Sequence, residues 1–87
     1  MKIKVLGFGC ARCHQLEQLT REVVKELAID ASIEEVKDIK KIMEYRILAT
    51  PGLVVNEELV CSGRVPTKTE VITFIINALD KEEKAKK

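Results

Sequence analysis

The chain has 87 residues, of which 46% are hydrophobic and 33% charged, and its formal net charge is +1 at pH 7. This length suits one domain, and the composition is that of a folded protein rather than a disordered one. The near-neutral charge and the lack of a long apolar run argue against nucleic acid and membrane as partners. We expect a monomer in the cytoplasm, because the chain starts without an apolar signal segment.

The N-terminal third of the chain predicts a strand followed by a helix. Charged and branched apolar residues alternate across Lys2–Leu6, which is typical of a strand, and Gly7 ends it. A helix that runs to about Ala28 is predicted by apolar residues at helical spacing, namely Leu16, Leu19, Val23, Val24 and Leu27. On its polar side, Glu17 and Arg21 stand one helical turn apart, which favours an ion pair.

The middle of the chain predicts a second strand and a short helix. The strand is expected at Ala31–Val36. Asp38 then has the position of an N-cap for a helix whose narrow apolar stripe consists of Ile39, Ile42 and Met43. A loop is expected to follow at Ala49–Gly52.

The last part of the chain predicts a hairpin and a terminal helix. Leu53–Val55 and Leu59–Cys61 are apolar runs separated by a short polar segment, which has the length of a hairpin connection. Thr67 and Glu70 have the spacing of a capping box ahead of an apolar helical face. We therefore expect one domain over residues 1–80, with a charged C-terminal tail over residues 81–87.

A Cys-x-x-Cys motif, Cys10 to Cys13, lies between the first strand and the first helix, with Gly7 and Gly9 before it. Two cysteines three residues apart at the start of a helix are close enough to form a disulfide. Cys13 shares the buried face with Leu16, whereas Cys10 falls at or near the N-cap and is the accessible sulfur. The unpaired N–H groups and the positive end of the helix dipole stabilise a thiolate, which predicts a lowered pKa for Cys10.

Nearby charge supports the same expectation. Lys2, Lys4 and Arg12 all precede the first acidic residue, Glu17, so no carboxylate close in sequence opposes a thiolate. In a reducing compartment, cysteines in this pattern indicate catalysis or metal binding rather than a structural disulfide framework.

The order of predicted elements, strand, helix, strand, helix, strand, strand, helix, resembles the minimal thioredoxin fold, which belongs to the α/β class. The chain is most similar to the small thioredoxin- and glutaredoxin-like proteins called redox-active disulfide proteins. Three segments carry the resemblance, namely Gly9–Cys13, Thr50–Gly52 and Gly63–Pro66. The resemblance implies a four-stranded mixed sheet flanked by helices.

The same resemblance implies an activity and a set of site residues. The activity is thiol–disulfide exchange with Cys10 as nucleophile and Cys13 as resolving cysteine. The supporting residues that it implies are Arg12, Thr50, Gly63 and a cis Pro51 that faces the cysteines. It implies no cofactor beyond the redox-active disulfide, and it implies disulfides of proteins or small molecules as substrates. The electron donor would be a thioredoxin-reductase-like flavoprotein or glutathione.

Three features depart from typical thioredoxins. No tryptophan precedes Cys10, Ala11-Arg12 replaces the Gly-Pro between the cysteines, and Lys4 stands roughly where those proteins bury an acidic residue. Proton transfer to Cys13 must then use water or another group. A glutathione site is not evident either, because surface solvation explains Arg64 and Lys68 more simply than carboxylate binding does.

A metal-binding or metallochaperone module is the main alternative, since a strand, a Cys-x-x-Cys and a helix also open ferredoxin-like copper carriers. The available ligand types are Cys10, Cys13, His14 and Cys61. Those carriers place a hairpin directly after the first helix, whereas a strand, a helix and a Thr-Pro loop intervene here. Cys10–His14 also matches the c-type haem attachment pattern, but that attachment needs export. Cys61 is most simply a small buried residue of a strand.

Overall fold

The computed structural model describes residues 1–9, 11–47 and 49–85. In chain order the elements are β1 (Lys2–Leu6), α1 (Ala11–Glu26), β2 (Ser32–Val36), α2 (Ile39–Glu44), β3 (Gly52–Val55), β4 (Glu58–Ser62) and α3 (Lys68–Ala85). The strands in these residues form one sheet in the order β2-β1-β3-β4. β1 is parallel to β2 and antiparallel to β3, and β3 is antiparallel to β4. The predicted α/β class and mixed four-stranded sheet are confirmed.

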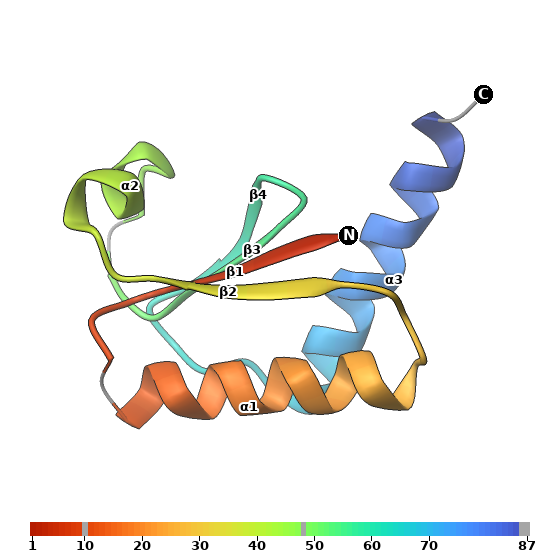
Figure 1. The fold of residues 1–87 in the computed structure, drawn as a ribbon, viewed down its shortest axis with the longest axis horizontal. Coiled ribbons are helices and arrows are strands. Elements are labelled where there is room, and N and C mark those ends of the chain that lie inside the picture. Colours follow the sequence, from red (N-terminus) through yellow and green to blue (C-terminus); the bar gives the residue numbers. More distant parts are fainter. Residues whose placement is uncertain (10, 48, 86–87) are drawn as a thin grey trace.

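The alternating pattern of β1 divides the core between the two faces of the sheet (Figure 1). Ile3 and Val5 belong to a buried cluster with side chains of α1 and α3, whereas Leu6 belongs to a second cluster beside α2. The first cluster comprises Ile3, Val5, Leu16, Val23, Leu53, Val55, Cys61, Val71 and Ile75. The second comprises Leu6, Val36, Ile42, Ile47 and Val54. The period-two pattern of a strand therefore places α1 and α3 on one face and α2 on the other.

Several local signals in the sequence have the predicted outcome. Asp38 caps α2, because its carboxylate accepts a hydrogen bond from the Lys40 N–H at 3.0 Å. The Glu17–Arg21 ion pair is present at 2.8 Å. No helix in the described part of the chain is long and apolar enough to cross a membrane.

Other boundaries differ from the prediction for local reasons. α1 ends at Glu26 rather than near Ala28, where φ is 52° and the backbone has left the helical region. The hairpin loop has two residues rather than three, since β4 begins at Glu58, and an irregularity between Leu53 and Val54 adjusts the register. Only Ile42 of the predicted α2 stripe is buried, because the helix meets the sheet along one narrow line.

The N-terminus of α3 carries the predicted capping box. The Thr67 N–H donates to Glu70 Oε1 at 3.2 Å, and the Glu70 N–H donates to Thr67 Oγ1 at 3.2 Å. The Arg64 guanidinium adds two hydrogen bonds to the same carboxylate. Arg64 first, and then the Thr67 backbone, lower the pKa of Glu70 to about 2.

This pKa predicts how acid affects stability. A carboxyl group whose pKa is lowered by folding stabilises the protein above its ordinary pKa, near 4.5, and loses that contribution as pH falls toward 2. We therefore expect Glu70→Gln to unfold in less urea than the wild type at pH 7 and to lose less stability between those two pH values. Urea unfolding at a series of pH values measures both effects.

The matched control is Glu83→Gln, which removes an exposed carboxylate from the same helix. This variant should retain the acid dependence of the wild type. Equal losses of stability on acidification in Glu70→Gln and in the wild type would contradict the role given to Glu70.

Candidate active site

Three segments that are distant in the sequence meet where β1 ends. Phe8, in the loop after β1, lines the same surface groove as Ala49 and Thr50. The Gly63 N–H donates a hydrogen bond to the Pro51 carbonyl oxygen at 2.9 Å. The fold therefore brings the segment before α1, the Thr50–Pro51 segment and the segment after β4 to one end of the sheet. Cys10, the predicted nucleophile, lies outside the described residues.

Cys13 is buried in the first turn of α1, as predicted from the spacing to Leu16. Its exposed fraction is 2%, and that of Leu16 is 0%. Its sulfur lies against Gly7, so closely that a Cβ atom at position 7 would overlap it. Sequence reasoning treated Gly7 as the end of a strand and missed this packing role, because no local pattern shows which distant atom a glycine leaves room for.

The Thr50–Pro51 peptide is cis, as the resemblance implied. Pro51 is buried and Thr50 is half-buried. Gly63 has a φ of 78°, a left-handed backbone conformation that suits glycine. Its hydrogen bond to Pro51 shows how Gly63 supports this segment, through its backbone and not through a side chain.

The N-terminus of α1 has a favourable electrostatic environment for an anion. Its first turn contains no acidic residue, and Arg12 is exposed there. The unpaired N–H groups of a helix start carry a partial positive charge. The first turn of α1 can therefore stabilise a thiolate at its end.

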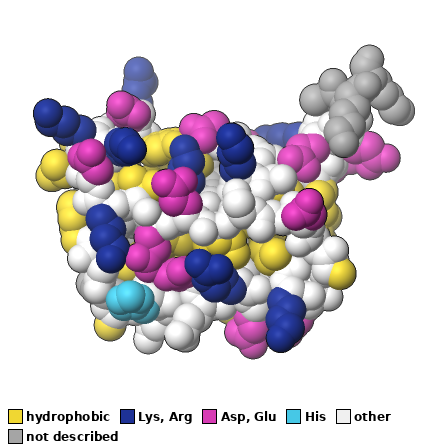
Figure 2. All heavy atoms as spheres, in the orientation of Figure 1, with side chains coloured by type: hydrophobic (Ala, Val, Ile, Leu, Met, Phe, Trp, Pro, Cys, Tyr) yellow, Lys and Arg dark blue, Asp and Glu magenta, His cyan; other side chains and the backbone are white. Residues whose placement is uncertain are grey.

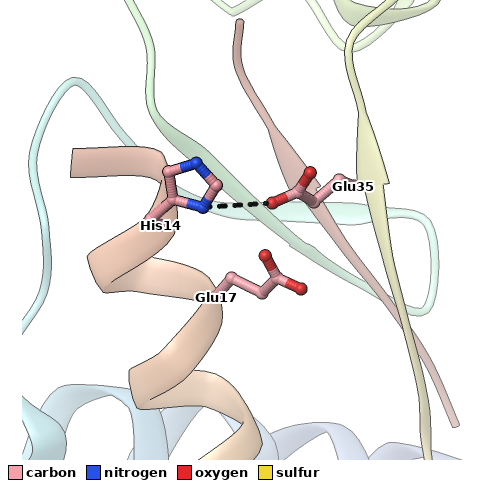
Figure 3. Close-up of side chains that lie close together, drawn as sticks. All are labelled: His14, Glu17 and Glu35. Atoms are coloured by element: carbon pink, nitrogen blue, oxygen red, sulfur yellow. Dashed lines mark ion pairs between the residues drawn. The ribbon is translucent and has the colours of Figure 1, made fainter. Parts of the chain in front are cut away.

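A cluster of ionisable side chains lies beside this turn (Figure 3). His14 and Glu17 of α1 point toward Glu35 of β2, and potential ligand atoms of all three lie within 4.8 Å of one another. His14 Nδ1 is 3.8 Å from Glu35 Oε1, a buried atom that has no hydrogen-bond partner among the described residues. The pKa of Glu17 is lowered, first by a hydrogen bond with the carboxyl group of Glu35 and then by a hydrogen bond from Arg21.

The charges around this cluster favour an ion-pair network. Arg21 contacts Glu17 at 2.8 Å, and Lys37 Nζ is 3.4 Å from the second oxygen of Glu35. These two cations would oppose the approach of a metal ion. Within the described ranges, Cys13 and Cys61 do not join His14 in a group of potential metal ligands.

The other candidate residues, Cys61, Arg64 and Lys68, make contacts within the protein. Cys61 is 8% exposed within the core between the sheet and α3, and its sulfur lies 3.9 Å from the Arg64 carbonyl oxygen. Arg64 is bound to Glu70, and Lys68 forms an ion pair with Glu26 at 2.6 Å. Both cations that sequence reasoning considered for a substrate carboxylate are thus engaged within the protein.

Comparisons with known proteins agree with this geometry. Residues 1–76 match the family model described as "Thioredoxin domain". Over 71 residues the chain is 49% identical to a thioredoxin of Methanothermobacter thermautotrophicus, and this match covers 82% of this chain and 92% of the relative. Over 69 residues it is 35% identical to a thioredoxin of Methanocaldococcus jannaschii, covering 79% of each.

A solved structure supports the fold. Thioredoxin 1 from Thermosipho africanus matches with a TM-score of 0.60 over 95% of this chain and 99% of that one. The two sequences are 20% identical, so the likeness concerns the fold alone.

The packing of Cys13 predicts the effect of a side chain at position 7. We expect Gly7→Ala to lower the free energy of unfolding by about 1–3 kcal/mol, the usual cost of overpacking a filled site. Urea unfolding of Gly7→Ala, Cys13→Ala and the double variant measures it. Because the alanine at position 13 removes the overlapping sulfur, the double variant should lose less stability than the sum of the two single losses. Strictly additive losses would show that the contact does not exist.

Proposed function

Because the chain belongs to the thioredoxin domain family and has a thioredoxin-like redox function, we propose that it is a thiol–disulfide oxidoreductase that uses Cys10 and Cys13. The observation that carries the division of roles is the burial of Cys13, which is 2% exposed against Gly7. A buried thiol cannot meet a large disulfide substrate directly. Cys10 is then the attacking cysteine, and Cys13 resolves the intermediate.

The exchange proceeds in two steps. The Cys10 thiolate attacks one sulfur of the substrate disulfide, so a mixed disulfide forms and the other substrate sulfur leaves as a thiolate. The Cys13 thiolate then attacks the Cys10 sulfur, which releases the second substrate thiol. The protein dithiol loses two electrons and two protons, and the substrate disulfide gains them. A dithiol reductant returns the protein to its starting state.

The helix start supports Cys10 as the nucleophile. The first turn of α1 lacks carboxylates and exposes Arg12, so its partial positive charge favours a thiolate in front of it. Arg12 adds a weaker contribution, since solvent and salt screen an exposed charge. His14 lies 3.8 Å from Glu35 and has no assigned step.

The surface beside the site favours a protein substrate. A groove of about 290 Å³ is lined by Phe8, Ile39, Ile42, Met43, Ile47, Ala49 and Thr50. Phe8, Ile39 and Met43 are each at least 59% exposed, and hydrophobic side chains reach the surface where α2 lies (Figure 2). An exposed apolar surface of this kind suits an apolar side chain next to the substrate disulfide. The Thr50 backbone would pair with the extended substrate chain.

Two cations at the start of α3 bear on the choice of electron donor. Glutathione is an anionic tripeptide, and the cations Arg64 and Lys68 are already paired. We therefore favour a thioredoxin-reductase-like flavoprotein as electron donor. A dithiol of this kind also suits a reducing compartment such as the cytoplasm. The metallochaperone alternative is not favoured, because β2, α2 and a cis proline intervene between α1 and the hairpin.

Two serine variants test the division of roles. Cys10→Ser should reduce no insulin disulfide and should trap no substrate, because it lacks the attacking sulfur. Cys13→Ser should attack once and accumulate a covalent adduct, because nothing resolves the mixed disulfide. Intact-protein mass spectrometry after mixing with disulfide-bonded insulin measures both outcomes.

Cys61→Ser is the matched control, since it alters the third cysteine, which lies in the core. It should retain turnover. If Cys10→Ser forms the adduct and Cys13→Ser does not, the proposed roles are reversed and the argument from the helix start is wrong.

A further inference from the structure

Three polar side chains from distant parts of the chain form a closed ring of hydrogen bonds beside α2. Lys4 of β1 donates from Nζ to the Tyr45 hydroxyl oxygen at 3.0 Å and to Glu57 Oε1 at 2.8 Å. The Tyr45 hydroxyl donates to Glu57 Oε2 at 2.9 Å. Lys4 Nζ also lies 5.7 Å from the centre of the Tyr45 ring. We call these three residues the polar ring.

The charges of the polar ring are mutually supporting. The hydrogen bonds that Lys4 donates, first to Glu57 and then to Tyr45, raise the pKa of Lys4, and the bond from Lys4 lowers the pKa of Glu57. The Lys4 side chain is 24% exposed, so the ammonium group is partly removed from water and gains from both partners. Lys4 and Glu57 are therefore both charged at neutral pH, and their bonds join β1, the end of α2 and the hairpin loop.

The backbone at Glu57 indicates that this side chain has a role. Asn56 and Glu57 form the two-residue hairpin loop, with φ values of 49° and 67°. Such a turn favours glycine at its second position, and a glutamate there is strained. The strain is offset by the bonds that Glu57 makes to Lys4 and Tyr45.

The polar ring fixes the end of α2. Tyr45 is the C-cap of this six-residue helix, whose one buried residue is Ile42. Directly after Tyr45, Arg46 has a φ of 54°, and the chain turns so that Ile47 enters the core. α2 and the segment that follows it supply the groove wall formed by Ile39, Met43 and Ile47, opposite Phe8.

We propose that the polar ring is a positioning device that holds the α2 wall of the groove in place for a protein substrate. Lys4, Tyr45 and Glu57 are positioning residues that act through α2 and take no part in thiol chemistry. This inference rests on the proposed function, because it assigns the ring to the substrate surface of that same site.

Tyr45→Phe tests the inference, because it removes the hydroxyl group and keeps the aromatic side chain that packs against the core cluster beside α2. A hydrogen bond of ordinary strength corresponds to a factor of about five in an equilibrium constant. We therefore expect the KM for insulin, with dithiothreitol as reductant, to rise about fivefold. The rate with hydroxyethyl disulfide, which is too small to need the groove, and the pH midpoint of cysteine alkylation should stay unchanged.

Two further variants separate positioning from general stability. Glu57→Gly removes the carboxylate while easing the strained turn, so a rise in the KM for insulin in this variant is not a result of unfolding. Glu58→Gln removes the next carboxylate of the same hairpin, which pairs with Lys81 of α3 at 2.7 Å and not with α2. It should retain the wild-type KM.

The outcomes are distinguishable. An unchanged KM for insulin in both Tyr45→Phe and Glu57→Gly would overturn the inference, as would an equal loss with both substrates or a shifted alkylation midpoint. If the wild type reduces neither disulfide, the proposed function fails and the inference fails with it. An active wild type with an unchanged KM for insulin in both variants removes the inference and leaves the proposed function standing.

Discussion

The contact between Cys13 and Gly7 is the constraint on which the candidate site depends. The sulfur fills the space where a side chain at position 7 would stand, so the end of β1 and the first turn of α1 are packed directly against each other. Cys13 and Leu16 of this helix are buried in the core. The first N–H groups of a helix have no partner within the helix, so this end of α1 carries a partial positive charge. The buried position of Cys13 therefore goes together with close packing at a strand end.

The two faces of the sheet differ in what they carry. The face that carries α1 and α3 contains the cluster of Val23, Leu53 and Ile75, and it anchors α1, the helix that carries Cys13. The face that carries α2 has a smaller core and, beside it, the apolar groove and the polar ring. We propose that the first face determines the reactivity of the thiols and that the second binds the substrate. Changes in α2 can therefore alter substrate preference without changing the thiols.

Local sequence signals predicted much of this structure, because each one depends on residues that are close in the chain. Each signal involves residues that are a few positions apart, as in the alternation in β1, the Asp38 cap and the capping box at Thr67. Family resemblance supplied the cis peptide at Pro51, which spacing alone would not have indicated. The packing of Gly7 and the polar ring were missed, since they join residues whose proximity only the fold determines.

The central claim, that Cys10 and Cys13 form one reversible dithiol, is tested most directly by a redox titration of the reduced protein, with mass spectrometry to locate the bridge. We expect a single two-electron transition between about −200 and −280 mV, the range of thioredoxins and glutaredoxins. The oxidised form should contain a Cys10–Cys13 disulfide, and Cys61 should remain a thiol. A bridge that includes Cys61, or no transition in this range, would contradict the account.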